Sequence, residues 1–125
     1  MTFRVERIDH VVLRVRDLAA MVHFYEQALG FNVERRLERI NLVQMRAGAS
    51  MLDLVAGARA EGAPNMDHLC FRVAPFDRDA IVRQLAPFGV SVGETVERYG
   101  AEGNGPSVYF HDPEGNQIEL KGPSS

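Results

Sequence analysis

An internal repeat is the feature that most restricts the fold of this chain. Residues 66–73, Met-Asp-His-Leu-Cys-Phe-Arg-Val, repeat residues 8–15, Ile-Asp-His-Val-Val-Leu-Arg-Val, with Asp, His, Arg and Val at identical places. Only two copies, far apart in sequence, are typical of a duplicated module rather than of a solenoid. The repeat therefore predicts that the 125 residues form one domain of two similar modules, about residues 6–57 and 66–121.

The same order of elements follows each copy. The apolar residues of segment 18–29 recur at the spacing of an amphipathic helix, and Asp17 and Gly30 are suited to its two ends. Further strands are expected at residues 31–37, 40–46 and 50–55 in the first module. The second module has a helix expected at 78–86, strands at 90–96, 108–110 and 117–120, and a glycine-rich loop at 100–106. This order predicts an α+β fold in which two paired βαβββ modules form a curved mixed sheet with the helices outside.

Composition excludes several classes of function. The chain is 46% hydrophobic and 25% charged, which is ordinary for a globular protein, and its net charge of −3 argues against a nucleic-acid-binding surface. No apolar run approaches the ~20 residues of a membrane span, and the N-terminus lacks an apolar signal core. A single cysteine, Cys70, cannot form an intramolecular disulfide. We therefore expect a soluble cytoplasmic protein with no nucleic-acid or membrane partner.

The stretch Asp-Pro-Glu-Gly-Asn at residues 112–116 predicts a hairpin turn between two strands. In the second of these strands Ile118 and Leu120 point to one face, so Glu119 points to the other. If the apolar pair packs on a helix, Glu119 faces the concave side of the sheet. A carboxylate there must be paired, protonated or bound to a metal.

The same alternation brings further polar residues to that side. His10 and His68 occupy matching positions in the two copies, and Asp53 lies between leucines in the last strand of the first module, as Glu119 does in the second. A single strand histidine is most often structural or solvated, but two that recur with matching acids favour a metal site. The set of His10, His68, Glu119 and Asp53 suits one divalent ion: Zn, Ni, Co, Mn or Fe. Asp53 is the open case, because its shorter side chain could bind the ion directly, reach it through water or only border the cavity.

Other candidates for substrate contact are weaker. Arg14 and Arg72 share the histidine face and could hold an anionic substrate, or they could instead pair with solvent or acidic neighbours. Gln44, Tyr99 and Tyr109 are further candidates. The loop at 100–106 could close over the site or could be an exposed connection.

Three motifs together resemble the vicinal oxygen chelate superfamily, which comprises glyoxalase I, bleomycin resistance proteins and extradiol dioxygenases. They are the Asp-His-x-x-x-Arg-Val opening, the end of the first helix at residues 24–31, and the Asp-Pro-Glu-Gly-Asn-x-Ile-Glu-Leu stretch at residues 112–120. The resemblance implies paired βαβββ modules, a homodimer, and a metal bound by His10, His68 and Glu119. Asp53 stands where glyoxalase I has a fourth ligand, a glutamate, which is a departure from that enzyme's pattern.

The resemblance also implies a function. It favours a metal-dependent, glyoxalase-like lyase or isomerase that acts on a small vicinally oxygenated metabolite, with Glu119 as general base. Ring-cleaving dioxygenases of the superfamily usually carry four modules, and two modules favour its short members. The alternatives are an extradiol-type dioxygenase with a His-His-Glu iron site, and a non-catalytic protein that sequesters a drug. A groove built only to bind would not require two histidines and two acids.

Overall fold

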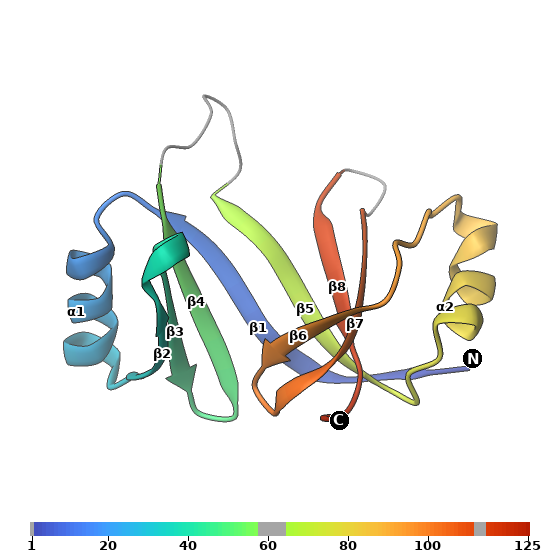
Figure 1. Ribbon diagram of the computed structural model, residues 1–125, viewed down its shortest axis with the longest axis horizontal. Coiled ribbons are helices and arrows are strands. Elements are labelled where there is room, and N and C mark those ends of the chain that lie inside the picture. The colour runs from blue at the N-terminus through green and yellow to red at the C-terminus, as the bar shows by residue number, and fades with distance from the viewer. Residues whose placement is uncertain (1, 58–64, 112–114) are drawn as a thin grey trace. The chain divides into compact units, whose positions relative to one another are not determined.

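The computed structural model describes residues 2–57, 65–111 and 115–125 (Figure 1). Contacts divide the chain into an N-terminal unit, residues 10–67, and a C-terminal unit, residues 1–9 together with 68–125. The first half of the chain holds β1 (Arg4–Val15), α1 (Leu18–Leu29), β2 (Asn32–Leu37), a 3₁₀ turn (Glu38–Ile40), β3 (Leu42–Ala47) and β4 (Ser50–Ala56). The second half holds β5 (Met66–Ala74), α2 (Arg78–Leu85), a 3₁₀ turn (Ala86–Phe88), β6 (Val96–Gly100), β7 (Gly103–His111) and β8 (Gln117–Lys121).

The N-terminal unit is a mixed sheet with a helix packed on one face. Its strands lie in the order β2-β3-β4-β1, with β1 parallel to β4 and the other pairs antiparallel. Helix α1 begins where the Asp17 carboxylate accepts a hydrogen bond from the Ala20 amide at 3.0 Å, and it ends at Gly30, whose φ of 73° is the left-handed conformation. The helix packs through an apolar cluster of Val22, Val43, Met45 and Leu54, with Leu13 and Val15 of β1 against it.

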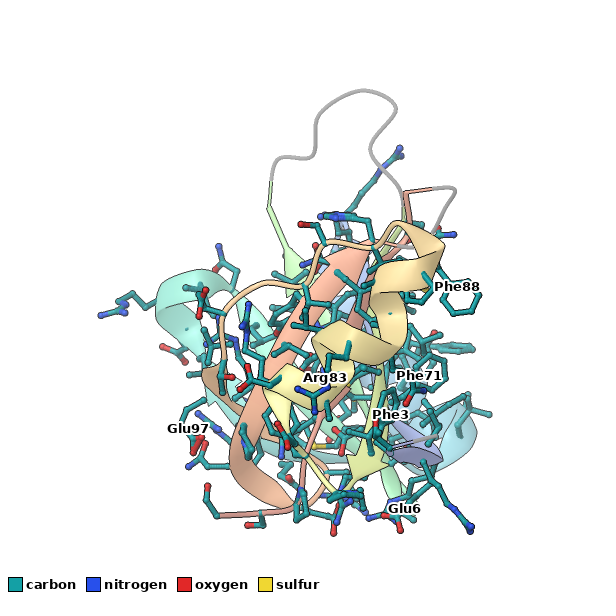
Figure 2. The ribbon with its side chains drawn as sticks, turned by 90° about the vertical axis from the view of Figure 1, so that its right-hand side faces the viewer. Phe3, Glu6, Phe71, Arg83, Phe88 and Glu97 are labelled. Atoms are coloured by element: carbon teal, nitrogen blue, oxygen red, sulfur yellow. The ribbon has the colours of Figure 1, made fainter. Side chains whose placement is uncertain are left out.

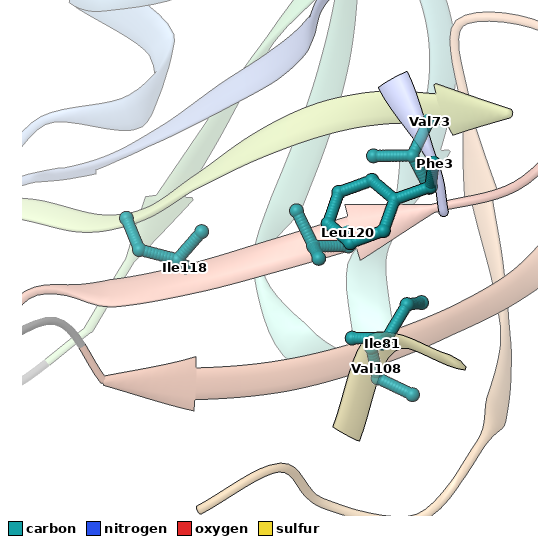
Figure 3. Packing of buried hydrophobic residues seen from close by; sticks show 6 residues of the cluster. All are labelled: Phe3, Val73, Ile81, Val108, Ile118 and Leu120. Atoms are coloured by element: carbon teal, nitrogen blue, oxygen red, sulfur yellow. The ribbon is translucent and has the colours of Figure 1, made fainter. Parts of the chain in front are cut away.

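The C-terminal unit repeats this plan. Its strands lie in the order β5-β8-β7-β6, again with one parallel pair, β5 and β8. Asp77 caps α2 by accepting a hydrogen bond from the Ala80 amide at 3.3 Å. The core of this unit contains Phe3, Val73, Ile81, Val108, Ile118 and Leu120 (Figure 3). Phe3 comes from the start of the chain, and Phe71 packs against the same cluster (Figure 2).

The α+β class and the two βαβββ modules predicted by the repeat are therefore confirmed. In each unit the apolar side chains that alternate along the strands face the helix. The polar set, which includes His10 in one unit and His68 in the other, consequently lies on the opposite face of its own sheet. No helix in the described ranges is long and apolar enough to cross a membrane.

Two predicted elements differ in the structure. The glycine-rich segment 100–106 is not a loop, because β6 and β7 pair across it with Gly100 opposite Gly103 and only a two-residue turn between them. Glycine is required there by the packing: a Cβ on Gly105 would lie 2.8 Å from the Lys121 Nζ and 2.8 Å from the Pro123 carbonyl oxygen. The interpretation of this segment as a lid is therefore wrong.

The strand predicted at 90–96 is also wrong, since only Val96 belongs to a strand. Residues 92 and 93 are held instead by Arg78 of α2, whose guanidinium donates to the Gly93 carbonyl at 2.8 Å and the Val92 carbonyl at 3.1 Å. The predicted turn at residues 112–114 and most of the connector at 57–65 lie outside the described residues.

Candidate functional site

Two ligand-type side chains, one buried and one partly exposed, lie close together on the polar face of the C-terminal unit. Strands β5 and β8 are parallel, with Cys70 opposite Glu119, so the alternation of β5 puts His68 on the same face as Glu119. The His68 Nε2 lies 3.1 Å from the Glu119 Oε1. Glu119 is 1% exposed, and His68 remains partly accessible with 14% of its side chain exposed. The sequence argument that brought these two residues together is correct within this unit.

The second carboxylate oxygen of Glu119 has a different neighbour. The Ser107 hydroxyl, on β7, donates a hydrogen bond to the Glu119 Oε2 at 2.7 Å. Ser107 is fully buried and lies between two paired strands, opposite Val96 on β6 and Lys121 on β8. The two oxygens of Glu119 are thus directed toward different partners, His68 on one side and Ser107 on the other.

Tyr109 borders the same pair. It lies directly opposite Glu119 in the β7–β8 register, and its ring stands edge-on to the His68 ring with a centroid separation of 5.7 Å. The Arg98 Nε donates to the Tyr109 hydroxyl at 3.3 Å, and the Arg98 guanidinium carbon is 5.7 Å from the ring centroid. Burial and the nearby Glu119 charge raise the pKa of Tyr109 to about 12, although Arg98 opposes the shift. At neutral pH Tyr109 is therefore a protonated hydroxyl.

In the N-terminal unit, Asp53 and Gln44 form a buried pair on the polar face of their sheet. They are opposite each other in the β3–β4 register, and the Gln44 Nε2 donates to the Asp53 Oδ2 at 3.1 Å. Val12 of β1 is opposite Asp53, so His10, two residues earlier, lies on the same face of this sheet. Gln44 therefore orients the Asp53 carboxylate.

Among the weaker candidates for substrate contact, two arginines pair with acidic side chains and one tyrosine lies on the other face of its sheet. The Arg14 guanidinium forms an ion pair with Asp67 within the N-terminal unit. The Arg72 guanidinium donates to the Glu102 Oε1 at 2.6 Å and the Glu6 Oε1 at 2.8 Å, which joins β5 to the β6–β7 turn and to β1. Tyr99 is opposite Asn104, and the alternation of β6 puts it on the face away from Glu119.

The donor atoms of His68 and Glu119 fit a divalent first-row metal. Ligand bonds of about 2.0–2.2 Å to nitrogen and oxygen place two donors roughly 3.0–3.4 Å apart on one ion, from octahedral to tetrahedral angles. The observed 3.1 Å between Nε2 and Oε1 lies in this range. In such metal centres a ligating carboxylate is itself usually hydrogen-bonded to a neighbouring group. The second oxygen of Glu119 has such a partner in the Ser107 hydroxyl.

Ser107 and Arg98 are the neighbours of this site that the sequence argument missed. Ser107 could have been found by extending the alternation used for Glu119 to the adjoining strand, since it lies two residues before Tyr109 on β7. Arg98 required the β6–β7 hairpin, which the glycine-rich composition concealed.

Comparison with known proteins agrees with this architecture. The Virulence protein STM3117 of Salmonella typhimurium is 35% identical over 124 residues, which cover 93% of this chain and 83% of that protein. Glutathione transferase FosA of Serratia marcescens is 26% identical over 119 residues, covering 92% of this chain and 79% of the transferase. A solved structure of a Streptomyces coelicolor methylmalonyl-CoA epimerase variant aligns with a TM-score of 0.70 and 27% identity, covering 98% of this chain and 97% of the epimerase.

The family itself is defined by a match over most of the chain. Residues 7–120 match the family described as the Glyoxalase/Bleomycin resistance protein/Dioxygenase superfamily. That range spans both copies of the repeat and includes His10, His68 and Glu119. This chain is therefore a member of the Glyoxalase/Bleomycin resistance protein/Dioxygenase superfamily.

Proposed function

We propose that this protein is a metal-dependent, glyoxalase-like enzyme of the lyase or isomerase class that acts on a small vicinally oxygenated metabolite. The observation that carries the proposal is the His68–Glu119 pair, with 3.1 Å between the His68 Nε2 and the Glu119 Oε1, a Ser107 hydrogen bond to Glu119 and the Tyr109 ring edge-on to His68. Relatives named as a transferase and an epimerase are enzymes by name, and the epimerase is an isomerase. These names support catalysis over simple sequestration.

His68 and Glu119 supply two of the proposed ligands, and His10 is proposed as the third. His10 has the support of the sequence repeat, in which it matches His68, and of the family resemblance. Asp53 stays a candidate fourth donor, held by Gln44 through one oxygen. The bound ion, proposed to be Zn, Ni, Co, Mn or Fe, would supply Lewis-acid stabilisation of negative charge on the substrate oxygens.

The proposed chemistry of the chain is a proton transfer. Glu119 takes a proton from a substrate carbon through Oε1, the oxygen that Ser107 does not hold, and returns it to the same or the neighbouring carbon, as a general base and then as a general acid. Tyr109 keeps its own proton, because its pKa of about 12 leaves the hydroxyl neutral at physiological pH. Its hydroxyl is thus suited to donate a hydrogen bond to a substrate oxygen.

The first prediction concerns the metal. Protein purified without chelator or metal-affinity tag should contain about one divalent ion per chain, and His68→Ala should lose it because an imidazole donor is removed. Elemental analysis by mass spectrometry measures this directly. The matched control is His23→Ala, since His23 is an exposed histidine of α1 and should leave the stoichiometry unchanged.

The identity of the ion separates the alternatives. Nickel, zinc, cobalt or manganese would support proton transfer, which is then tested by solvent deuterium incorporation into candidate hydroxy- and oxo-metabolites followed by NMR. Iron would favour the extradiol-type dioxygenase, assayed as oxygen consumption with catechols. Absence of metal, even after soaking with each ion, would contradict the enzyme and leave the drug-sequestering protein. The expected homodimer is tested separately by light scattering.

A further inference from the structure

We propose that Ser107 is a positioning residue that orients the carboxylate of Glu119 so that only Oε1 is presented to the metal. This inference rests on the proposed metal-dependent function. Its basis is the geometry of one buried hydrogen bond, from the Ser107 Oγ to the Glu119 Oε2 at 2.7 Å.

The two oxygens of the carboxylate are not equivalent in this arrangement. Oε1 lies 3.1 Å from the His68 Nε2, on the side where an ion would share both donors. Oε2 is turned toward β7 and accepts the hydroxyl proton of Ser107. A carboxylate bound to an ion through both oxygens would have to rotate Oε2 away from Ser107. The hydrogen bond therefore favours binding through one oxygen and fixes which one it is.

Ser107 can hold this position because its backbone is fixed on both sides. Strand β7 lies between β6 and β8, with Ser107 opposite Val96 and Lys121, and the residue is 0% exposed. Because Ser107 is 0% exposed, bulk solvent does not compete with its hydroxyl for the Glu119 carboxylate, and the side chain at residue 107 contributes to the orientation of Glu119. Partners of this kind typically change metal affinity by about 10- to 100-fold when they are removed.

Ser107→Ala tests the inference because it deletes one buried atom and leaves the ligands in place. We expect it to weaken metal affinity by about tenfold or more in chelator-competition titrations. With Co²⁺ as the probe, release of Oε2 should raise the coordination number and lower the intensity of the d–d absorption. Ser107→Thr keeps the hydroxyl and should restore both values toward those of the wild type.

Val108→Ala is the control for a purely structural effect. Val108 is the next residue of the same strand, is 0% exposed, and faces the helix in the core of the C-terminal unit. It should lower thermal stability while leaving affinity and the Co²⁺ spectrum unchanged, and this comparison stands even if Ser107→Thr fails to fold. Wild-type affinity and spectrum in Ser107→Ala would overturn the role of Ser107 alone. Equal losses of affinity in Ser107→Ala and Val108→Ala would also overturn it. A wild-type protein that binds no ion would overturn the proposed function as well.

Discussion

At the scale of single residues, Glu102 pairs with two arginines of the C-terminal unit, Arg72 and Arg7. Its carboxylate, on the β6–β7 turn, accepts from Arg72 at 2.6 Å and forms an ion pair with Arg7 at 2.5 Å. Partial burial raises the pKa of Glu102, but the hydrogen bonds and charges of Arg72 and Arg7 outweigh that effect and hold the pKa below its usual value. The interactions of the ionised Glu102 carboxylate with these two arginines therefore stabilise the fold.

Glu102→Gln should accordingly lower the free energy of unfolding at neutral pH, by about 1 kcal/mol or less for a partly exposed pair. Because the folded pKa is below the unfolded one, this contribution is present above pH 4.5 and is lost as the pH falls below that value. Urea denaturation of both proteins at pH 7 and pH 4 should show a difference that narrows in acid. Glu94→Gln, with a side chain 88% exposed, should show no difference at either pH.

Single residues also show how far the sequence could predict the site. Strand alternation was enough to bring His68 to Glu119, because both lie on regular strands and a shift of one residue would have buried them against the helix. The same rule assigned Arg72 to the correct face but could not find its partners. Glu6 and Glu102 are distant in sequence, and only the register of β1 and the β6–β7 hairpin brings them to the guanidinium.

At the scale of elements, the β6–β7 hairpin is the element that sequence reasoning misread. Glycines at 100, 103 and 105 suggested a loop, yet each glycine lies in a strand. The reason for two of them is close packing: a Cβ on Gly100 would meet the Asp9 carboxylate and the Lys121 side chain, and a Cβ on Gly105 would meet Lys121 and the Pro123 carbonyl oxygen. Composition alone does not distinguish a glycine required for flexibility from one required by close packing.

Gly105→Ala should therefore destabilise the protein. Its Cβ would lie 2.8 Å from the Lys121 Nζ, 2.8 Å from the Pro123 carbonyl oxygen and 3.2 Å from the Gly122 carbonyl oxygen. Two of these neighbours are backbone atoms, and displacing them costs more free energy than moving the end of a flexible side chain. We expect a loss of about 1–3 kcal/mol, typical of overpacking, measured by chemical denaturation.

Gly93→Ala is the matched control, since its Cβ would meet only the Tyr109 carbonyl oxygen at 3.5 Å, an ordinary contact. Its stability should stay within about 1 kcal/mol of the wild type. Equal stability of the two alanine variants would contradict the packing argument for the hairpin.

At the scale of the whole molecule, the repeat predicted two modules, and their internal order was correct. The repeat does not indicate which unit the first residues of the chain join. Residues 1–9 belong with 68–125, since Phe3 is buried in that core, Glu6 contacts Arg72, and the Ala101 amide donates to the Asp9 carboxylate at 3.0 Å. None of these contacts is encoded by local periodicity.

Phe3→Ala should thus destabilise mainly the C-terminal unit, by roughly 3–5 kcal/mol for a buried phenylalanine. Hydrogen exchange read residue by residue should show lost protection across residues 68–125 before residues 10–67. Val5→Ala, at a position 53% exposed, should leave exchange in both units unchanged. Uniform loss of protection in Phe3→Ala would indicate that the two units unfold together.

The membership of Phe3 also has a consequence for how the chain is made. The ribosome synthesises residues 3–9 before the strands that bury Phe3, and that core is complete only when Ile118 and Leu120 have been added. Because translation adds about 5–20 residues per second, several seconds or longer pass between the synthesis of Phe3 and that of the residues that bury it. We expect residues 10–67 to have their own apolar cluster available during that interval, whereas the C-terminal unit folds only after translation of β8. Phe3 is thus translated before residues 10–67 but is buried in its core only after β8 has been added.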